Sequence, residues 1–450
     1  MMLSHTQAAP SQRALSIKAN LAAGGLTIPS DFIGYSFNTT TMLKGLLNGS
    51  ATSLINLAKM VGSSGRLRVG GSDQDWSPAP NLTPQLASDL GAFVTALGAG
   101  WKCLYGLDLA INDPALAATQ AGYLDAVMGS KVSFHFGNEP MASGYLNTGN
   151  YAARWNSYYS SLIAALPAAA LMAPDELSFS PVPTLVNGLT PTKNGLAAIT
   201  MHWYVALGTP HTAEGLIATI RANILSVTNT TGFFNNNEWA GSVPQVVTES
   251  NSFSGGGLPG VSDRLCAAIW YLNQAMVFAK GGFAGLCTHN NLAWDGSSGW
   301  ANGPVVGAVK PNAYGALLVQ PDLISCAPGA IFYGIYLFSK VLGQQILKAQ
   351  TDSNANHTSL ATLGPNGSAN ILIANNDTVN SLVVTPDQTS VWTSANVLML
   401  SGSGPYDAAP TLGGASIGVG GTWGGAPTPI NFGQTVTIPP CCAALIQIQP

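Results

Sequence analysis

From residue 32 to about residue 343 the chain alternates short apolar runs with longer segments that carry apolar residues at helical spacing. Alternation of this kind is the sequence mark of βα units and a parallel sheet. We expect eight strands, at residues 33–37, 66–71, 102–109, 132–137, 177–181, 199–204, 245–249 and 283–289. The helices expected between and after them include residues 50–61, 84–97, 150–166, 212–227, 261–279 and 330–342.

Eight such units predict an α/β protein built on a (β/α)8 TIM barrel, with a catalytic barrel domain at residues 30–343. Beyond it the pattern changes to period-two runs such as 369–374, 381–385, 397–400 and 435–438, which predict an all-β module. An early strand at residues 14–21 precedes the barrel and can pair into that module. The sequence therefore predicts a second domain, a C-terminal β-sandwich of residues 14–29 plus 344–450 that is joined by the N-terminal strand.

Two glutamates stand where an apolar strand runs into a turn: Glu139 follows expected strand four, and Glu249 ends expected strand seven. The carboxyl ends of barrel strands form the face where barrel enzymes place their chemistry. Hydrolysis of a glycosidic bond with retention needs one carboxyl as proton donor and one carboxylate as nucleophile, about 5 Å apart. The pair predicts a retaining glycosidase with Glu139 as acid/base and Glu249 as nucleophile, working without a metal or other cofactor.

Neighbouring polar residues extend this site. The amide of Asn138 is placed to bind a sugar 2-hydroxyl, and the hydroxyl of Tyr204 at the end of strand six is placed to hold Glu249 ionised. Asp73 and Gln74 follow strand two, where they can meet sugar hydroxyls. Trp294, with Trp239 and Trp300, offers a stacking surface for a sugar or rim packing. For the histidines at 135, 202 and 289 we expect core or supporting roles.

The composition limits the substrate. Only 8% of residues are charged, the formal net charge is -4 and the pI is near 5.8, so no basic stripe for nucleic acid or a sulfated polysaccharide is expected. The apolar stretch 265–287 is interrupted by Asn273, Gln274 and Lys280, which favours a buried helix and strand over a membrane span. We expect a monomer that acts on a small glycoside or oligosaccharide.

The N-terminus has no apolar signal-peptide region, so a secreted or periplasmic location requires a leader already removed. The six cysteines show no metal-ligand spacing. If a disulfide forms, we expect it to join Cys326 to Cys441 or Cys442.

Several motifs resemble the β-glucuronidase and heparanase family, glycoside hydrolase family 79, over nearly the whole chain. They are Arg68-Val69-Gly70-Gly71-Ser72, Gly137-Asn138-Glu139-Pro140, His202-Trp203-Tyr204, Glu249-Ser250-Asn251-Ser252 and Gly255-Gly256-Gly257 followed by Gly260-Val261-Ser262-Asp263. The resemblance implies a retaining (β/α)8 hydrolase whose triglycine loop binds the carboxylate of a uronic acid through main-chain N–H groups. Glycine suits that task because it lets the backbone approach a ligand closely.

Two positions differ from the family pattern. Strand one continues with Asn38 where that pattern has a glutamate, and the loop offers Phe253 and Ser254 where it has a tyrosine. We count Asn38 and Ser254 among the sugar-binding candidates. An exo-acting β-glucuronidase is the leading interpretation, and a β-glucosidase or a diglycosidase of the same family is the alternative. A non-catalytic carbohydrate-binding barrel is the alternative from another class.

Overall fold

The computed structural model describes most of the chain. The described residues are 12–17, 19–43, 45–75, 82–177, 179–190, 195–206, 212–213, 215–217, 243–290, 313–320, 322–349, 356–386, 394–431 and 434–449.

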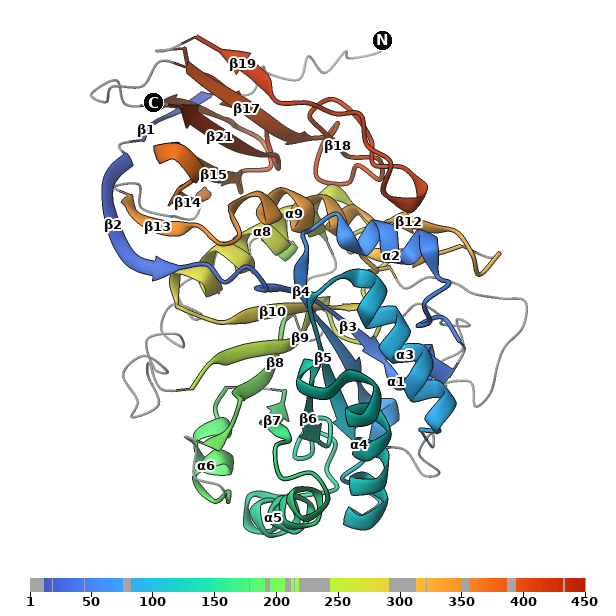
Figure 1. Cartoon of the computed structure of the whole chain (residues 1–450). Coiled ribbons are helices and arrows are strands. Elements are labelled where there is room, and N and C mark those ends of the chain that lie inside the picture. The colour runs from blue at the N-terminus through green and yellow to red at the C-terminus, as the bar shows by residue number, and fades with distance from the viewer. Residues whose placement is uncertain are drawn as a thin grey trace, which may run out of the picture.

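Eight parallel strands close into a barrel (Figure 1). In chain order they are β3 (Ile33–Asn38), β4 (Ser64–Gly70), β5 (Gly100–Leu107), β6 (Val132–Phe136), β7 (Ala170–Glu176), β8 (Ala198–Ala206), β9 (Gln245–Phe253) and β10 (Gly285–Asn290). Strand β10 pairs with both β3 and β9, which closes the ring. The predicted (β/α)8 barrel is confirmed.

Helices cover the outside of the barrel (Figure 1). They are α1 (Thr39–Leu43), α2 (Thr52–Lys59), α3 (Pro84–Leu97), α4 (Pro114–Met128), α5 (Thr148–Ala165), α6 (Val182–Asn187), α8 (Leu265–Lys280) and α9 (Ala330–Phe338). Helix α3 has the predicted bounds, because Thr83 caps its first turn and Pro84 fits its first position. The helix expected at 212–227 lies largely outside the described residues.

The expected strand at residues 177–181 was wrong: the fifth barrel strand is β7, Ala170–Glu176. Its sequence, Ala-Leu-Met-Ala-Pro-Asp-Glu, is poor in β-branched residues and contains Pro174, so burial in the barrel outweighs a weak local preference. The described residues after it, 177 and 179–181, lie in bends and turns, and Phe179 packs on Trp203, with ring centroids 4.7 Å apart. The expected end of strand seven was also early, because β9 continues beyond Glu249 to Phe253.

Two β-bulges shape the inside of the barrel. Along β7, Pro174 pairs with Thr200 and Glu176 with Met201, so Asp175 is an extra residue, and its φ is 59°. Along β9 the register shifts in the same way around Thr248. A bulge changes which side chains point inward and is common beside active sites.

The second unit is all β, as predicted. Its large sheet contains β2 (Ala19–Thr27), β13 (Gln345–Ala349), β14 (His357–Leu363), β15 (Ala369–Asn375), β17 (Ser394–Ser401), β18 (Thr411–Leu412), β19 (Thr428–Ile430) and β21 (Ala443–Gln449). A small sheet contains β1 (Gln12–Ile17), β16 (Ser381–Pro386) and β20 (Val436–Ile438), and β11 (Leu317–Val319) pairs with β12 (Cys326–Pro328) elsewhere. The N-terminal segment joins this unit through β1 on β16 and β2 on β13.

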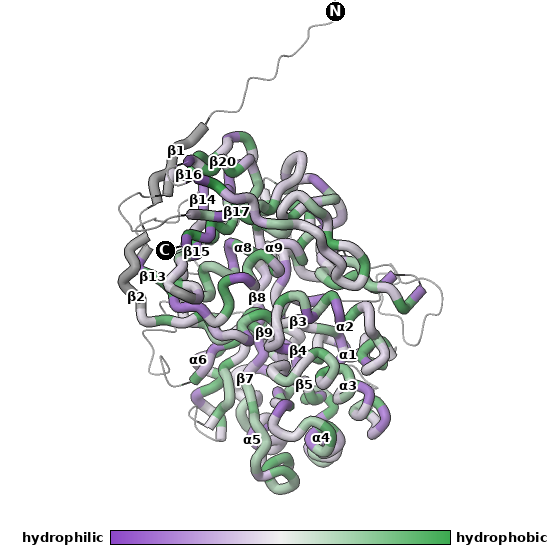
Figure 2. Tube along the Cα trace, turned by 45° about the horizontal axis from the view of Figure 1, so that its top comes forward, coloured by the Kyte–Doolittle hydropathy of each residue, from purple (hydrophilic) through white to green (hydrophobic). Residues whose placement is uncertain are grey.

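Helices α8 and α9 lie between the barrel and the β unit, as both overall views show (Figures 1 and 2). All nine residues of α9 are buried, and so are nearly all of α8. A helix that is apolar on every side needs cover on every side, which the barrel and the sheets provide. The amide of Asn273 on α8 donates to Asn376 Oδ1 across this interface at 2.8 Å. Within the described residues, no helix is both long and apolar enough to cross a bilayer.

The disulfide expected at Cys326 was wrong. All six cysteines lie in the described part of the chain as buried thiols, and none of them forms a disulfide. Cys441 and Cys442 pack in the core of the β unit, and Cys326 lies on β12. They behave as small apolar residues, which is common for buried cysteine.

Candidate active site

Glu139 and Glu249 meet at the carboxyl-terminal end of the barrel. They are 110 residues apart in sequence, yet one carboxylate oxygen of each lies within 4.8 Å of the other. Paired carboxyl groups of inverting glycosidases are about 6.5–9.5 Å apart, whereas those of retaining enzymes are about 5–5.5 Å apart. The nearest oxygens therefore approach as closely as those of a retaining pair, and more closely than those of an inverting pair.

The turn after β6 presents Glu139. Its backbone has φ of 50°, and its N–H donates to the carbonyl of Asp175 at 2.9 Å. Left-handed backbone in a non-glycine residue costs about 1–2 kcal/mol, and such residues cluster at functional sites. The Glu139 side chain retains 19% exposure and accepts from His202 Nδ1 at 2.7 Å. It is the more open of the two carboxyls, because the Glu249 side chain is only 9% exposed.

Glu249 is held as a carboxylate. Its oxygens accept from Arg68 Nη1 at 2.5 Å and from the Tyr204 hydroxyl at 2.6 Å. Burial opposes ionisation, but positive charge on His289, His202 and Arg68 and the Tyr204 bond lower the pKa of Glu249 to about 2. Burial also lowers the pKa of His289, to about 4, so at neutral pH His202 and Arg68 supply the charge. Glu249 is thus ionised near neutral pH.

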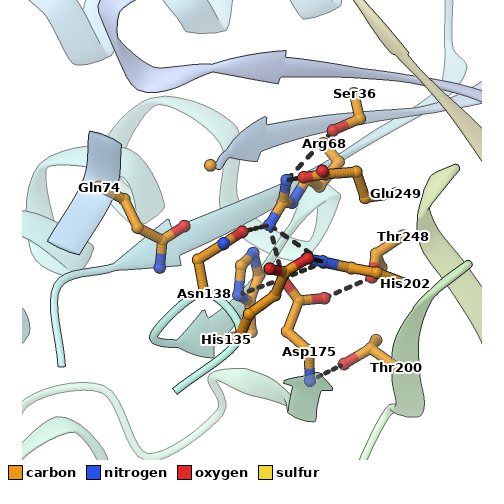
Figure 3. A network of polar contacts seen from close by, with 12 residues as sticks. Ser36, Arg68, Gln74, His135, Asn138, Asp175, Thr200, His202, Thr248 and Glu249 are labelled. Carbon is orange, nitrogen blue, oxygen red and sulfur yellow. Dashed lines mark hydrogen bonds and ion pairs between the residues drawn. The ribbon is translucent and has the colours of Figure 1, made fainter. Parts of the chain in front are cut away.

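Arg68 on β4 is the centre of the site (Figure 3). The side chain is fully buried, and its partners come from five other strands or strand ends, because His202 Nε2 on β8 also lies 3.4 Å from Arg68 Nη2. It donates to Glu249 Oε2, Asn138 Oδ1, Asp175 Oδ2 and Ser36 Oγ, at distances from 2.5 to 3.2 Å. Burial alone would lower the pKa of Arg68, but the charges of Asp175 and Glu249 raise it above its usual value. In the sequence Arg68 stood out only as part of a motif, yet it binds Glu249 directly.

Asp175 is the functional candidate that the sequence analysis missed. Its carboxylate is fully buried and accepts from Arg68 at 2.6 Å and from His202 Nε2 at 3.1 Å, with Thr248 donating to its other oxygen. It was missed because the fifth strand was expected at residues 177–181, which places Asp175 before the strand and not at its carboxyl end. An Asp-Glu pair at the end of a weak apolar run was the available signal, since that is where barrel residues reach the active face.

The three strand histidines differ in protonation. His202 faces carboxylates at both ring nitrogens, and although burial opposes it, Asp175 and then Glu249 raise the pKa of His202 to about 10. Burial lowers the pKa of His135 to about 4. His289 Nδ1 lies 3.0 Å from Ser36 Oγ. The expected supporting role fits all three positions, but His202 contacts Glu139 directly, and His289 Nδ1 lies 3.7 Å from Glu249 Oε2.

Glu139, His202 and Glu249 also form a cluster of the residue types that bind metals, with one atom of each within 4.8 Å of the others. The donor set does not fit a metal ion. A ligating histidine must offer a nitrogen lone pair. His202 instead has both nitrogens directed at carboxylate oxygens, at 2.7 and 3.1 Å, and its raised pKa favours a protonated ring near neutral pH.

Asn138 and Asp73 are both tied to the protein. Asn138 Oδ1 accepts from Arg68, which leaves its NH2 group as the side-chain donor for a ligand. Asp73 on the short 3-10 helix η1 (Ser72–Asp75) accepts from the N–H groups of Thr39 and Thr40, and burial raises the pKa of Asp73 to about 6. Asp73 therefore anchors the start of α1, and both Asp73 Oδ1 and Asn38 Oδ1 lie within 3.3 Å of the place that a Cβ on Gly71 would take.

Asn38 has unmet hydrogen-bonding capacity. It is 1% exposed, and neither its Oδ1 nor its Nδ2 has a partner within the described structure. It lies two residues beyond Ser36 on β3, so both side chains leave the same side of the strand, and Ser36 contacts Arg68. A buried amide without partners is costly unless a ligand or water meets it. The Asn38 amide can therefore accept or donate a hydrogen bond to a ligand or a water.

The triglycine loop follows the end of β9, four residues beyond Glu249. Gly255, Gly256 and Gly257 all have positive φ, of 70°, 100° and 83°. Ser254 is exposed at its start. Gly257 is packed so tightly that a Cβ there would lie 2.9 Å from both Ser262 and Tyr314. Trp294, Trp239 and Trp300 lie outside the described residues.

No protein-family model matches the chain, and no curated protein matches it in sequence. The fold is similar to a 4-O-α-L-rhamnosyl-β-D-glucuronidase of Fusarium oxysporum 12S, solved with Rha-GlcA, with TM-score 0.74 and 17% identity, covering 96% of this chain and 100% of that one. It is also similar to a family 51 α-L-arabinofuranosidase of Thermotoga petrophila RKU-1, with TM-score 0.70, 12% identity and coverage of 96% and 100%. A family 44 xyloglucanase of Paenibacillus polymyxa gives TM-score 0.61, 12% identity and coverage of 97% and 100%.

At such identities the similarity establishes the fold: a (β/α)8 barrel with an additional C-terminal β unit, matched over nearly its whole length. What this chain adds is its own geometry, a close carboxylate pair on the active face of the barrel.

Proposed function

We propose that this protein is a retaining glycoside hydrolase in which Glu139 is the acid/base and Glu249 the nucleophile. The observation that carries the proposal is the approach of the two carboxylates to within 4.8 Å at the active face of the barrel. The similar folds, whose proteins are glycosidases, support the same class.

In the first step a Glu249 oxygen forms a bond to the anomeric carbon as the bond to the leaving group breaks, and Glu139 gives its proton to the leaving oxygen. In the second step Glu139 takes a proton from water, the water oxygen bonds to the anomeric carbon, and the ester to Glu249 breaks. No cofactor takes part. The NH2 group of Asn138 is available to the sugar 2-hydroxyl, a contact that strengthens in the oxocarbenium-like transition state.

The substrate we propose is a β-D-glucuronide that is cleaved from its non-reducing end. The family 79 motifs support it, and so does the similar fold of a rhamnosyl-β-D-glucuronidase. The triglycine loop beyond Glu249 offers main-chain N–H groups to the uronate, and Asn38 offers an unpaired amide to a ring hydroxyl. A β-glucoside, or a disaccharide-bearing glycoside, is the alternative that Asn38 and Ser254 keep open.

Two rivals make different predictions. A non-catalytic sugar-binding barrel binds without turnover, yet it has no use for a nucleophile held ionised by Arg68 and Tyr204. An endo-acting hydrolase of a sulfated polysaccharide needs a basic groove, which a chain with 8% charged residues and a net charge of -4 does not favour.

The substrate is tested with chromogenic β-glucuronide, β-glucoside, β-xyloside and β-galactoside compared by kcat/KM. We expect the glucuronide to be preferred by at least about tenfold, because a site built for a charged group loses several kcal/mol when that group is missing. Equal rates for glucuronide and glucoside would contradict the uronate assignment while leaving the glycosidase assignment intact.

The loop is tested by Gly257→Ala, with Gly255→Ala as its matched control. Both residues have positive φ, but only Gly257 has neighbours that a Cβ would meet at 2.9 Å, whereas Gly255 has open space. We expect Gly257→Ala to raise KM for the glucuronide more than for the glucoside, by about tenfold. Gly255→Ala should change KM for both substrates by the same factor, because its only cost is the left-handed backbone, about 1–2 kcal/mol. If KM for the glucuronide and the glucoside changes by the same factor in both variants, the loop has no role in recognising the uronate.

The acid/base is tested by Glu139→Ala with leaving groups of different pKa. Loss of a general acid costs about 10²–10⁴-fold when the leaving group needs its proton, and far less for a dinitrophenolate. We expect hydrolysis of alkyl glycosides to be lost. With dinitrophenyl glycosides we expect a burst of dinitrophenolate followed by slow turnover. Azide should accelerate that turnover and give a β-glycosyl azide. Equal loss for all leaving groups would assign Glu139 another role.

A further inference from the structure

We propose that Asp175 is a positioning residue that keeps His202 doubly protonated and so fixes the Glu139 carboxyl for proton transfer. This rests on the proposed function only in that Glu139 is taken as the acid/base.

The backbone directs Asp175 into the site. It is the extra residue of the bulge between β7 and β8, with φ of 59°, and its N–H donates to Thr200 Oγ1 at 3.1 Å. Its carbonyl in turn accepts from the Glu139 N–H at 2.9 Å. One strained residue thus sets the direction of a buried carboxylate and the position of the Glu139 backbone.

A chain of three groups links Asp175 to the catalytic acid. Asp175 Oδ2 lies 3.1 Å from His202 Nε2, and His202 Nδ1 lies 2.7 Å from Glu139 Oε1. The ionised Asp175 can only accept, so Nε2 carries a proton toward it, and Nδ1 carries one when Glu139 Oε1 accepts, either as a carboxylate oxygen or as the carbonyl oxygen of the acid. His202 is itself fully buried, and a buried imidazolium needs a compensating anion. Asp175 is that anion, because it is fully buried and within direct contact.

The other charges around Asp175, His202 and Glu139 are balanced. The charged or titratable groups that face Asp175 or His202 are Arg68 on β4, His135 on β6, Glu139 after β6, Glu249 on β9 and, further away, His289 on β10 and Tyr151 on α5. With Glu139 protonated, the anions Asp175 and Glu249 match the cations Arg68 and His202. Removal of the charge of Asp175 breaks this balance, and the cheapest response is loss of the His202 proton.

Asp175→Asn is therefore the informative change, because it keeps the size of the side chain and removes its charge. His202 is protonated up to a pKa of about 10 while Asp175 is ionised. Without that anion, burial lowers the pKa of His202, so the ring gives up its proton at a lower pH. Glu139 then loses the charged donor that orients it.

The direct test is nitrogen NMR of the six histidines, with His202→Gln used to assign the His202 signals. In the unaltered protein we expect both His202 nitrogens to remain protonated from pH 5 to about pH 8. In Asp175→Asn the ring should become neutral within that range. Thr248→Val is the control, since it removes the hydroxyl bond to Asp175 but keeps the carboxylate, and His202 should stay charged.

Kinetics supply the second readout. In Asp175→Asn we expect kcat for an alkyl glycoside to fall about 10²-fold and kcat for a dinitrophenyl glycoside to fall less than about tenfold. The alkaline limb of kcat/KM should also move to lower pH. A merely structural role would lower kcat for both substrates by the same factor and leave the pH profile unchanged.

The outcomes separate this proposal from the proposed function. A neutral His202 ring at pH 7 in the unaltered protein overturns the role of Asp175, whether or not Asp175→Asn folds. A ring that stays doubly protonated at pH 8 in Asp175→Asn overturns it as well. Failure of the unaltered protein to hydrolyse any glycoside would instead overturn the proposed function, and the NMR result would still stand.

Discussion

Glu249→Ala is expected to lose at least about 10⁴-fold in kcat for an aryl β-glycoside, because without a nucleophile the covalent intermediate cannot form. Azide should restore turnover by entering the space that the carboxylate leaves, and the product should be the α-glycosyl azide. Attack then comes from the face that Glu249 occupied, while Glu139 still protonates the leaving group. The anomeric form of the azide, read by proton NMR, is the decisive measurement.

This result distinguishes Glu249 from Glu139, since azide on the acid/base variant gives the opposite anomer. Turnover at an unimpaired rate in Glu249→Ala would contradict the proposed mechanism. So would an α-azide obtained from Glu139→Ala, which would exchange the two roles.

Arg68→Met is expected to lower the free energy of unfolding by about 3–5 kcal/mol at pH 7, because it leaves buried carboxylates without their shared cation. Arg68 is fully buried and bonded to Asp175 and Glu249, which are themselves almost inaccessible to water. Burial then raises the pKa of each carboxylate that has lost its partner. Urea denaturation followed by circular dichroism measures the change.

Lys102→Met is the matched control. Lys102 pairs with Asp31 at 3.3 Å, but its side chain is 55% exposed, and exposed pairs contribute about 0–1 kcal/mol. The two substitutions remove the same charge from neighbouring strands, β4 and β5. Equal losses of stability in both variants would show that Arg68 is not the electrostatic centre of the barrel.

Most of the barrel could be predicted from periodicity. Strands β3, β4, β5, β6, β8, β9 and β10 carry apolar runs that local preference and burial both favour, so the pattern found them. Strand β7 failed because an Ala- and Pro-containing segment does not look like a strand by itself. It becomes one only because the closed barrel supplies partners on both sides.

The carboxylate pair could also be predicted, but its supporting residues could not. Glu139 and Glu249 stand at strand ends that the pattern locates. Asp175 was missed, and the direct contact of His202 with Glu139 was not anticipated, because a bulge of one residue reverses which side chain points inward. No period in the sequence marks such a bulge.

The sequence alone determined the layout of this protein: eight βα units, an all-β unit that recruits the N-terminal strand, and two glutamates at the same end of one barrel. Apolar spacing carries that information because burial acts on every residue of a strand or helix. Only the tertiary structure decided the charge states at the centre. These depend on Arg68, Asp175 and His202 meeting from separate strands, away from water, where each contact changes the protonation of the next.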